Sequence, residues 1–88
     1  KKKKKNYVYI LKCHNTAYYT GWTNDLNRRI AMHNSGKGAK YTRAFRPCVL
    51  SYVEVFDTKE EALKREAQIK KMTRKEKEEL IGIGKREA

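Results

Sequence analysis

The stretch YYTGWTNDLNRRIAMH (residues 18–33) joins a strand to a helix through a short polar turn. Aromatic and β-branched residues predict the strand over 18–23, and Thr23 or Asn24 is placed to cap a helix over 25–34. The glycine and the apolar positions of this stretch serve the fold. Folding alone does not explain why a tyrosine, an arginine and a histidine stand so close together, so these three indicate a functional site.

Two more strands are predicted on either side of this stretch. NYVYILKC (residues 6–13) has the composition of a well-buried strand, and it is expected to pair with the 18–23 strand as an antiparallel hairpin. VLSYVEVF (residues 49–56) alternates well enough to form a third strand.

Two further helices are predicted after the third strand. Thr58 and Glu61 fit a capping box that opens an amphipathic helix, DTKEEALKREAQIKKM (residues 57–72). RKEKEELIGI (residues 74–83) predicts a short last helix. The order β-β-α-β-α-α predicts an α+β fold with a small, mostly antiparallel three-stranded sheet flanked by helices.

Length and charge limit the class of protein. The 88 residues predict one domain over 6–83, between a basic tail at 1–5 and a C-terminal tail at 84–88. Residues 1–47 hold 12 lysines and arginines against one acid, a net charge of +11, whereas residues 48–88 hold 10 against nine, a net of +1. This asymmetry favours a nucleic-acid partner; the alternative is an ordinary solvated basic surface.

The sequence shows no apolar run of ~20 residues and no secretory leader, which predicts a cytoplasmic protein without a membrane span. No heptad pattern or apolar stripe argues for a dimer, so a monomer is expected.

Charged groups stand at the edge of the apolar face of the helix over 25–34. Leu26, Ile30 and His33 share that face at helical spacing, and Arg29 borders it. Arg29 and His33 are therefore expected one turn apart and side by side. The structural alternative is that Arg29 extends over the core edge while His33 is a satisfied core residue.

Glu66 is a carboxylate on an otherwise apolar helix face, between Ala62 and Ile69. Removing such a charge from water is costly unless a cation meets it. The pattern leaves two partners open. One is Arg29 or a neighbouring lysine, and the other is a divalent metal ion.

Cys13 and Cys48 are isolated in the sequence, without a Cys-x-x-Cys spacing. A zinc site that joined them to His14 and His33 would need a coincidence of fold. Both cysteines are therefore predicted to be small apolar residues.

Tyrosines are prominent in the predicted hairpin. Tyr7 and Tyr9 lie on one face of the first strand, and Tyr18 and Tyr19 point to opposite faces of the second. A hairpin centred near residues 14 to 15 puts Tyr9 roughly opposite Tyr19 or its neighbour. Two phenols are therefore expected to meet across the strand pair.

Taken together, these residues resemble the motifs of the GIY-YIG nuclease family. YVY (residues 7–9) resembles its first motif, and YTG (residues 19–21) resembles its second. Arg29 is similar to the family's arginine, His33 to the His or Tyr one turn further on, and Glu66 to its metal-binding glutamate. The five matches follow in order and at fitting spacing.

The resemblance implies a metal-dependent nuclease whose catalytic residues are Tyr9, Tyr19, Arg29 and His33. Tyr9 would accept a proton from the attacking water, with Tyr19 and His33 in its hydrogen-bond network. Arg29 would hold a non-bridging phosphate oxygen and, with the metal, is expected to lower the pKa of the Tyr9 phenol. Glu66 would bind one Mg²⁺ or Mn²⁺ ion, weakly in the absence of substrate, to stabilise the leaving oxygen.

SGKGAKYTR (residues 35–43) further resembles the small stand-alone bacterial branch of the family. Lys37, Lys40 and Arg43 are placed to contact backbone phosphates, while Tyr41 stacks on a base or packs under the loop. Nothing resembles a helix that reads the major groove, so binding selective for nucleic-acid structure is expected.

The chain departs from the family pattern at the glycine and isoleucine of the first motif, which are Tyr7 and Val8, and at Trp22, where some members have a lysine. The expected function is metal-dependent, endonuclease-type hydrolysis of nucleic-acid phosphodiesters. DNA is the expected substrate, and a protein partner could supply specificity. The alternative is a non-catalytic nucleic-acid-binding module with an idle or partner-dependent site.

Overall fold

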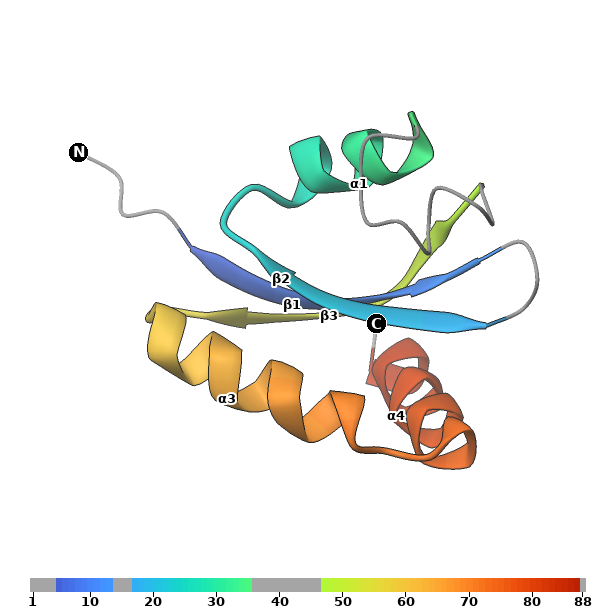
Figure 1. The fold of residues 1–88 in the computed structure, drawn as a ribbon. Coiled ribbons are helices and arrows are strands. Elements are labelled where there is room, and N and C mark those ends of the chain that lie inside the picture. Colours follow the sequence, from blue (N-terminus) through green and yellow to red (C-terminus); the bar gives the residue numbers. More distant parts are fainter. Residues whose placement is uncertain (1–4, 14–16, 36–46, 88) are drawn as a thin grey trace.

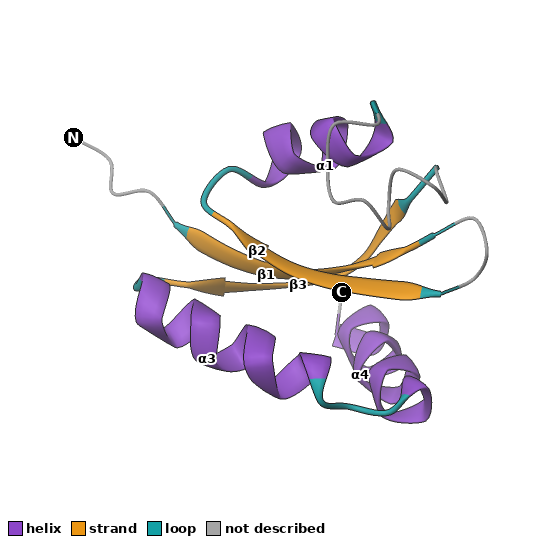
Figure 2. Cartoon of the chain, viewed as in Figure 1, coloured by secondary structure: helices purple, strands orange, loops and turns teal. Residues whose placement is uncertain are grey.

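In the computed structural model, which describes residues 5–13, 17–35 and 47–87, a three-stranded sheet lies between helices (Figure 1). The elements are β1 (Asn6–Lys12), β2 (Tyr18–Thr23), α1 (Leu26–Asn34), β3 (Val49–Phe56), α3 (Lys59–Lys70) and α4 (Arg74–Glu87). Figure 2 shows α1 on one face of the sheet and α3 and α4 on the other. The predicted α+β class and element order are confirmed.

The central strand is β1, because the sheet order is β2-β1-β3 and both pairs are antiparallel. Its residues Val8, Tyr9, Ile10 and Leu11 are all fully buried. A strand that is covered on both faces has no solvent side, so its apolar run is continuous rather than alternating. Tyr9 and Leu11 face α1, whereas Val8 and Ile10 face α3 and α4.

The centre of the hairpin agrees with the prediction, but the partner of Tyr9 differs from it by one or two residues. The backbone N–H of Cys13 donates to the carbonyl of Ala17 at 2.8 Å, which centres the hairpin on residue 15. Tyr9 therefore pairs with Gly21 rather than with Tyr19 or its neighbour. Tyr19 becomes the diagonal neighbour of Tyr9 on the same face, where long aromatic side chains still reach one another.

The cap of α1 is Asp25, not Thr23 or Asn24 as predicted. The Asp25 carboxylate accepts a hydrogen bond from the backbone N–H of Arg28 at 3.3 Å. Thr23 uses its hydroxyl to close the preceding turn, accepting from the Asp25 N–H at 3.0 Å. A carboxylate at this position also interacts favourably with the positive end of the helix dipole.

The two C-terminal helices cover the other face of the sheet. The predicted cap by Thr58 is confirmed, since the Glu61 N–H donates to the Thr58 hydroxyl at 3.2 Å. The Glu61 carboxylate accepts from that hydroxyl at 3.1 Å, in place of the bond to the Thr58 N–H that a full capping box has. The last helix continues to Glu87, although the sequence assigned residues 84–88 to a tail. Gly82 costs about 1 kcal/mol in a helix, but Leu80 and Ile81 pack against the core and hold this part of α4 on the sheet. In the described part of the chain, no helix is long and apolar enough to cross a membrane.

The two cysteines lie in the core beneath α1, and they are adjacent in space rather than isolated. Their sulfur atoms are 3.2 Å apart, and both residues are buried beside Tyr9. Asn34 fixes Cys48 through two hydrogen bonds to its backbone, at 2.7 and 3.0 Å. Burial, followed by the contact with Cys48, raises the pKa of the Cys13 thiol to about 12, so this thiol is neutral.

Candidate active site

Tyr9 and His33 form the buried centre of the site. The Tyr9 hydroxyl lies 3.0 Å from Nε2 of His33, and both residues are 1% exposed. Tyr9 comes from the central strand, and His33 reaches down from the last turn of α1. The rings of Tyr9 and Tyr19 both meet the imidazole edge-on, with centroids 6.0 and 5.1 Å away. The hydrogen bond and the two ring contacts hold the imidazole in one orientation.

Gly21 makes room for this arrangement. A Cβ atom at Gly21 would lie 2.5 Å from the Tyr9 hydroxyl oxygen and 2.7 Å from Cζ. Such distances are far below van der Waals contact, so the phenol occupies the space that a side chain would need. The glycine of the YTG stretch is therefore required by the position of Tyr9.

Burial controls the ionisation of the Tyr9 phenol. Burial is the main cause that raises its pKa, and the neighbouring Tyr19 and the Glu66 carboxylate raise it further. Arg29 lowers the pKa, but not enough to offset burial. The expected direction of the Arg29 effect is therefore confirmed, but burial outweighs it, and the phenol of the protein alone is neutral at pH 7.

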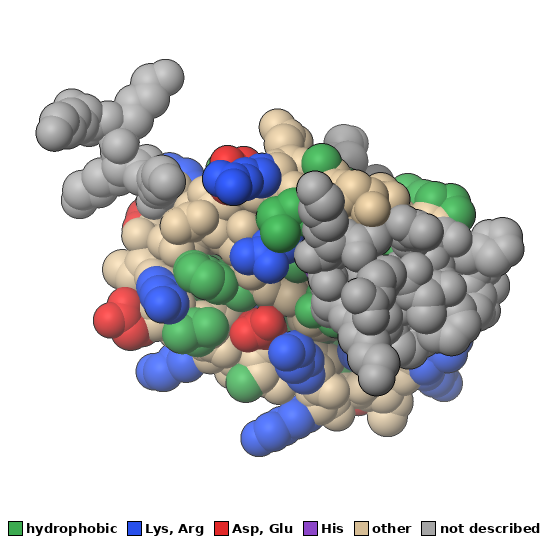
Figure 3. Space-filling view, turned by 45° about the horizontal axis from the view of Figure 1, so that its top comes forward, with side chains coloured by type: hydrophobic (Ala, Val, Ile, Leu, Met, Phe, Trp, Pro, Cys, Tyr) green, Lys and Arg blue, Asp and Glu red, His purple; other side chains and the backbone are tan. Residues whose placement is uncertain are grey.

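His33 is also neutral at pH 7. Burial lowers the pKa of its imidazole, and the positive charge of Arg29 lowers it further. A neutral imidazole carries one N–H and one free nitrogen lone pair, so it can either accept a proton from Tyr9 or donate one. The His33 side chain is 1% exposed. Figure 3 shows Lys and Arg side chains at several places on the α1 side of the molecule.

Arg29 is a partly exposed cation at the rim of this centre. It acts electrostatically on both Tyr9 and His33. No carboxylate among the described residues forms an ion pair with it, so its guanidinium is open to an anion from solution. A surface hollow beside it is lined by Thr23, Asn24, Asp25, Arg28, Arg29 and Met32.

Glu66 approaches the site from α3, with its side chain 19% exposed. Its carboxylate forms an ion pair with the ammonium group of Lys70, one turn further along the helix, at 3.4 Å. The sequence left two kinds of partner open for Glu66, and the partner within the protein is a neighbouring lysine. Because Glu66 also raises the pKa of Tyr9, its charge lies within electrostatic reach of the phenol.

Whether the site can hold a divalent metal ion depends on the Glu66 carboxylate. Across residues 5–13, 17–35 and 47–87, no three His, Cys, Asp or Glu side chains gather closely enough to hold an ion. The Lys70 ammonium nevertheless shows that a cation can occupy the space beside the Glu66 carboxylate. Mg²⁺ and Mn²⁺ suit such a site, because they keep several waters and take further oxygens from a substrate.

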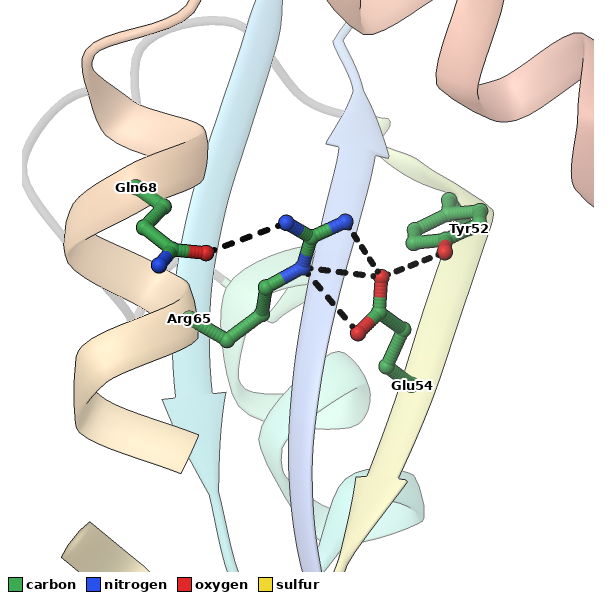
Figure 4. Close-up of polar contacts among 4 residues, drawn as sticks. All are labelled: Tyr52, Glu54, Arg65 and Gln68. Atoms are coloured by element: carbon green, nitrogen blue, oxygen red, sulfur yellow. Dashed lines mark hydrogen bonds and ion pairs between the residues drawn. The ribbon is translucent and has the colours of Figure 1, made fainter. Parts of the chain in front are cut away.

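A second network, which the sequence did not predict, orients α3 on the sheet (Figure 4). The Arg65 Nε donates to both carboxylate oxygens of Glu54 at 3.1 Å, and Tyr52 donates to the same carboxylate. A further Arg65 nitrogen donates to Gln68 at 3.1 Å. Because the next residue projects about 100° around the helix, fixing Arg65 against β3 turns Glu66 away from that strand.

The basic loop residues Lys37, Lys40, Tyr41 and Arg43 lie outside the described residues. Their predicted contacts with nucleic acid therefore stay predictions.

Comparison with known proteins matches this arrangement to a family. The profile described as the GIY-YIG catalytic domain matches residues 5–79. The chain belongs to the GIY-YIG family. A UPF0213 protein of Clostridium perfringens is 58% identical to this GIY-YIG chain over 76 residues, which cover 86% of this chain and 82% of the relative. A UPF0213 protein of Staphylococcus saprophyticus is 52% identical over 80 residues, covering 91% of this chain and 98% of the relative.

Solved structures agree with this assignment. The solution NMR structure of a UPF0213 protein from Bacillus halodurans has a TM-score of 0.60 to this GIY-YIG chain at 47% identity, covering 90% of this chain and 84% of that one. The solution NMR structure of an E. faecalis protein has a TM-score of 0.64 at 44% identity, covering 92% of this chain and 86% of that one. The predicted family and fold are confirmed.

Proposed function

We propose that this GIY-YIG protein hydrolyses phosphodiester bonds of nucleic acids in a metal-dependent reaction. The proposed substrate is DNA, selected by its structure rather than by base sequence. The observation that carries the proposal is the 3.0 Å hydrogen bond between Tyr9 and His33, with Arg29 and Glu66 both acting on the same phenol. Membership of a nuclease family and the net charge of +12 support it.

Proton transfer is the first requirement of the reaction. A buried phenol with a raised pKa does not ionise by itself, so Tyr9 acts here as a relay. The attacking water gives a proton to the Tyr9 oxygen, while the Tyr9 O–H proton passes to Nε2 of neutral His33. The phenol stays neutral throughout, and the imidazole ends with the extra proton.

Charge stabilisation is the second requirement. Arg29 donates to a non-bridging phosphate oxygen, where negative charge grows as water attacks. A guanidinium without a carboxylate partner in the described part of the chain is ready for this contact. Tyr19 keeps the imidazole in place through the contact of the two rings. In this proposal, Lys37, Lys40 and Arg43 contact backbone phosphates and Tyr41 stacks on a base.

Glu66 would hold the Mg²⁺ or Mn²⁺ ion, which supplies stabilisation of the leaving oxygen when it is bound. With one carboxylate, the affinity for the ion is low until a substrate adds its own oxygens.

A non-catalytic nucleic-acid-binding module is the second candidate. Two observations favour it. The raised pKa keeps the Tyr9 phenol protonated, and the ion pair with Lys70 already supplies Glu66 with a cation.

The experiment that separates the two candidates measures cleavage of labelled single-stranded, duplex and branched DNA with Mg²⁺ or Mn²⁺. Wild type is compared with Glu66→Gln, and with Glu60→Gln as a matched control on the exposed side of the same helix. We expect wild type to cleave at least one substrate, and Glu66→Gln to lose about 100-fold or more in rate. Glu60→Gln should match wild type.

Binding is measured on the same DNA molecules in EDTA, where cleavage is prevented. Retained binding by Glu66→Gln shows that the loss lies in chemistry. Binding without cleavage on every substrate would favour the non-catalytic module. Equal cleavage by wild type and Glu66→Gln would show that the site is assigned wrongly.

A further inference from the structure

We propose that a second backbone phosphate of the nucleic acid binds in a hollow beside β2, and that Lys70 leaves Glu66 to bind it. The Lys70–Lys77 hollow is the surface depression lined by Tyr18, Tyr19, Thr20, Lys70 and Lys77. This inference rests on the proposed function. Beyond that function, the inference gives the path of the substrate backbone past the reacting phosphate. It also explains how binding of the second phosphate frees Glu66 to bind the metal ion.

Two residues connect the hollow to the candidate site. Tyr19 lines the hollow, and its ring also contacts the imidazole of His33. Lys70 lines the hollow, and its ammonium also pairs with Glu66 at 3.4 Å. A ligand in the hollow therefore adjoins the candidate site, as the neighbouring phosphate of a polymer would.

The lining of the hollow suits a phosphate. Lys70 and Lys77 supply two ammonium groups from two different helices. Arg74 lies nearby, 4.9 Å over the ring of Tyr18, but its charge is paired with Glu78 at 3.3 Å. Thr20 is buried, and its hydroxyl has no hydrogen-bond partner among the described residues. This lining offers an anion two ammonium groups, while the Thr20 hydroxyl stays buried.

The ion pair between Lys70 and Glu66 is easily exchanged. It joins residues four apart on one helix, and the Lys70 side chain is 56% exposed. Pairs of this kind contribute little to stability, so Lys70 can turn to another anion at low cost. The metal ion and Lys70 compete for the same carboxylate. A phosphate in the hollow draws Lys70 away and leaves Glu66 free for the metal.

The first measurement is the affinity for a fluorescently labelled DNA oligonucleotide in EDTA, followed by anisotropy at several salt concentrations. Lys70→Gln and Lys77→Gln are compared with wild type. Lys75→Gln is the matched control, because it removes the same charge from the same helix as Lys77 but lines a different hollow. We expect each of the first two variants to bind about 3- to 10-fold more weakly. Each should also lower the salt slope by roughly 0.7 to 0.9.

The second measurement is Mn²⁺ binding without nucleic acid, followed by electron paramagnetic resonance. Because the competing ammonium is gone, Lys70→Gln should bind Mn²⁺ about two- to five-fold more tightly than wild type. Lys75→Gln and Lys77→Gln should leave this affinity close to that of wild type. Opposite changes in DNA and metal affinity from one substitution are not expected of a residue that serves only the fold.

Specific outcomes would overturn the inference. Equal DNA affinities and salt slopes for Lys70→Gln, Lys77→Gln and Lys75→Gln would show that the hollow is outside the interface. Unchanged Mn²⁺ affinity in Lys70→Gln would show that Lys70 does not compete with the metal. If wild type still cleaves DNA in either case, this inference alone fails. Wild type that neither binds nor cleaves nucleic acid would refute the proposed function as well.

Discussion

At the scale of single residues, the site depends on a glycine that holds no chemistry of its own. Tyr9 occupies the space that a side chain at Gly21 would fill, and this position brings its hydroxyl to His33. In the sequence, Gly21 is recognisable as the last residue of the YTG stretch, which resembles the second family motif. The reason for it is visible only in the register, because Gly21 is the residue that pairs with Tyr9.

Gly21→Ala should displace the Tyr9 ring and destabilise the protein. The added methyl group would lie 2.5 Å from the Tyr9 hydroxyl oxygen, so the ring must move and its hydrogen bond to His33 is lost. Overpacking of this kind costs about 1–3 kcal/mol. The free energy of unfolding in urea measures it.

The matched control for this change is Gly82→Ala. A Cβ atom at Gly82 meets nothing within 4 Å, and the residue lies inside α4. Alanine is the better helix former, so this variant should gain about 0.5–1 kcal/mol. Equal stability of Gly21→Ala and wild type would contradict the assigned packing of Tyr9.

The protonation of His33 should make stability depend on pH. Burial, and then Arg29, lower the pKa of His33 in the folded protein below its value of about 6.5 in the unfolded chain. Below that value the unfolded chain binds the proton more readily. Stability is therefore fully present above about pH 6.5 and falls as the pH decreases, with a slope of at most about 1.4 kcal/mol per pH unit for one proton.

Unfolding in urea between pH 5 and 8 tests this dependence. His33→Gln serves as the control, because it removes the titrating imidazole. Its stability should be lower than that of wild type but flatter across this pH range. A wild-type stability that does not change between pH 5.5 and 7.5 would contradict a buried neutral imidazole.

At the scale of elements, the position of α3 determines whether Glu66 reaches the site. Arg65 and Glu54 form the contact that orients this helix, and their side chains are only 27% and 22% exposed. The ion pair between Arg74 and Glu78 on α4 makes a useful contrast, since both side chains are about half exposed. Shielding from water makes the first pair stronger than the second.

Glu54→Gln should therefore destabilise the protein by about 1–2 kcal/mol, because Arg65 and Tyr52 both lose a charged acceptor. Glu78→Gln should cost less than about 0.5 kcal/mol. Chemical unfolding of the two variants under the same conditions compares them directly. A larger loss for Glu78→Gln would show that the contact between α3 and β3 does not orient the helix as described.

Elements were more predictable from the sequence than the contacts between them. Residues 18–23 and 49–56 form strands with the predicted boundaries, because aromatic and β-branched residues are bounded there by clear turn signals. The cap of α1 was assigned to the wrong residue, since three neighbouring polar side chains could all serve and only the turn geometry selects Asp25. The Glu54–Arg65 contact leaves no periodic signal, because it joins a strand to a helix.

At the scale of the whole molecule, the sheet brings together side chains that lie far apart in the sequence. Tyr9, His33 and Glu66 come from a central strand and from helices on opposite faces of the sheet. Their motif order and spacing made them predictable as a set. The ionisation of Tyr9 was not predictable, because it depends on how completely the three layers bury it. The ion pair between Glu66 and Lys70 could be predicted from the sequence, because the two residues are four apart on one helix.

Arg29 provides the most direct test of the nuclease assignment. The measurement is the single-turnover rate of DNA cleavage, with saturating Mg²⁺ and enough protein to bind all of the DNA. Arg29→Ala is compared with Arg28→Ala, which removes the same charge one residue away in the same hollow. We predict a loss of roughly 100- to 1000-fold for Arg29→Ala and less than about 10-fold for Arg28→Ala. Equal rates for the two variants would contradict a role for Arg29 at the reacting phosphate.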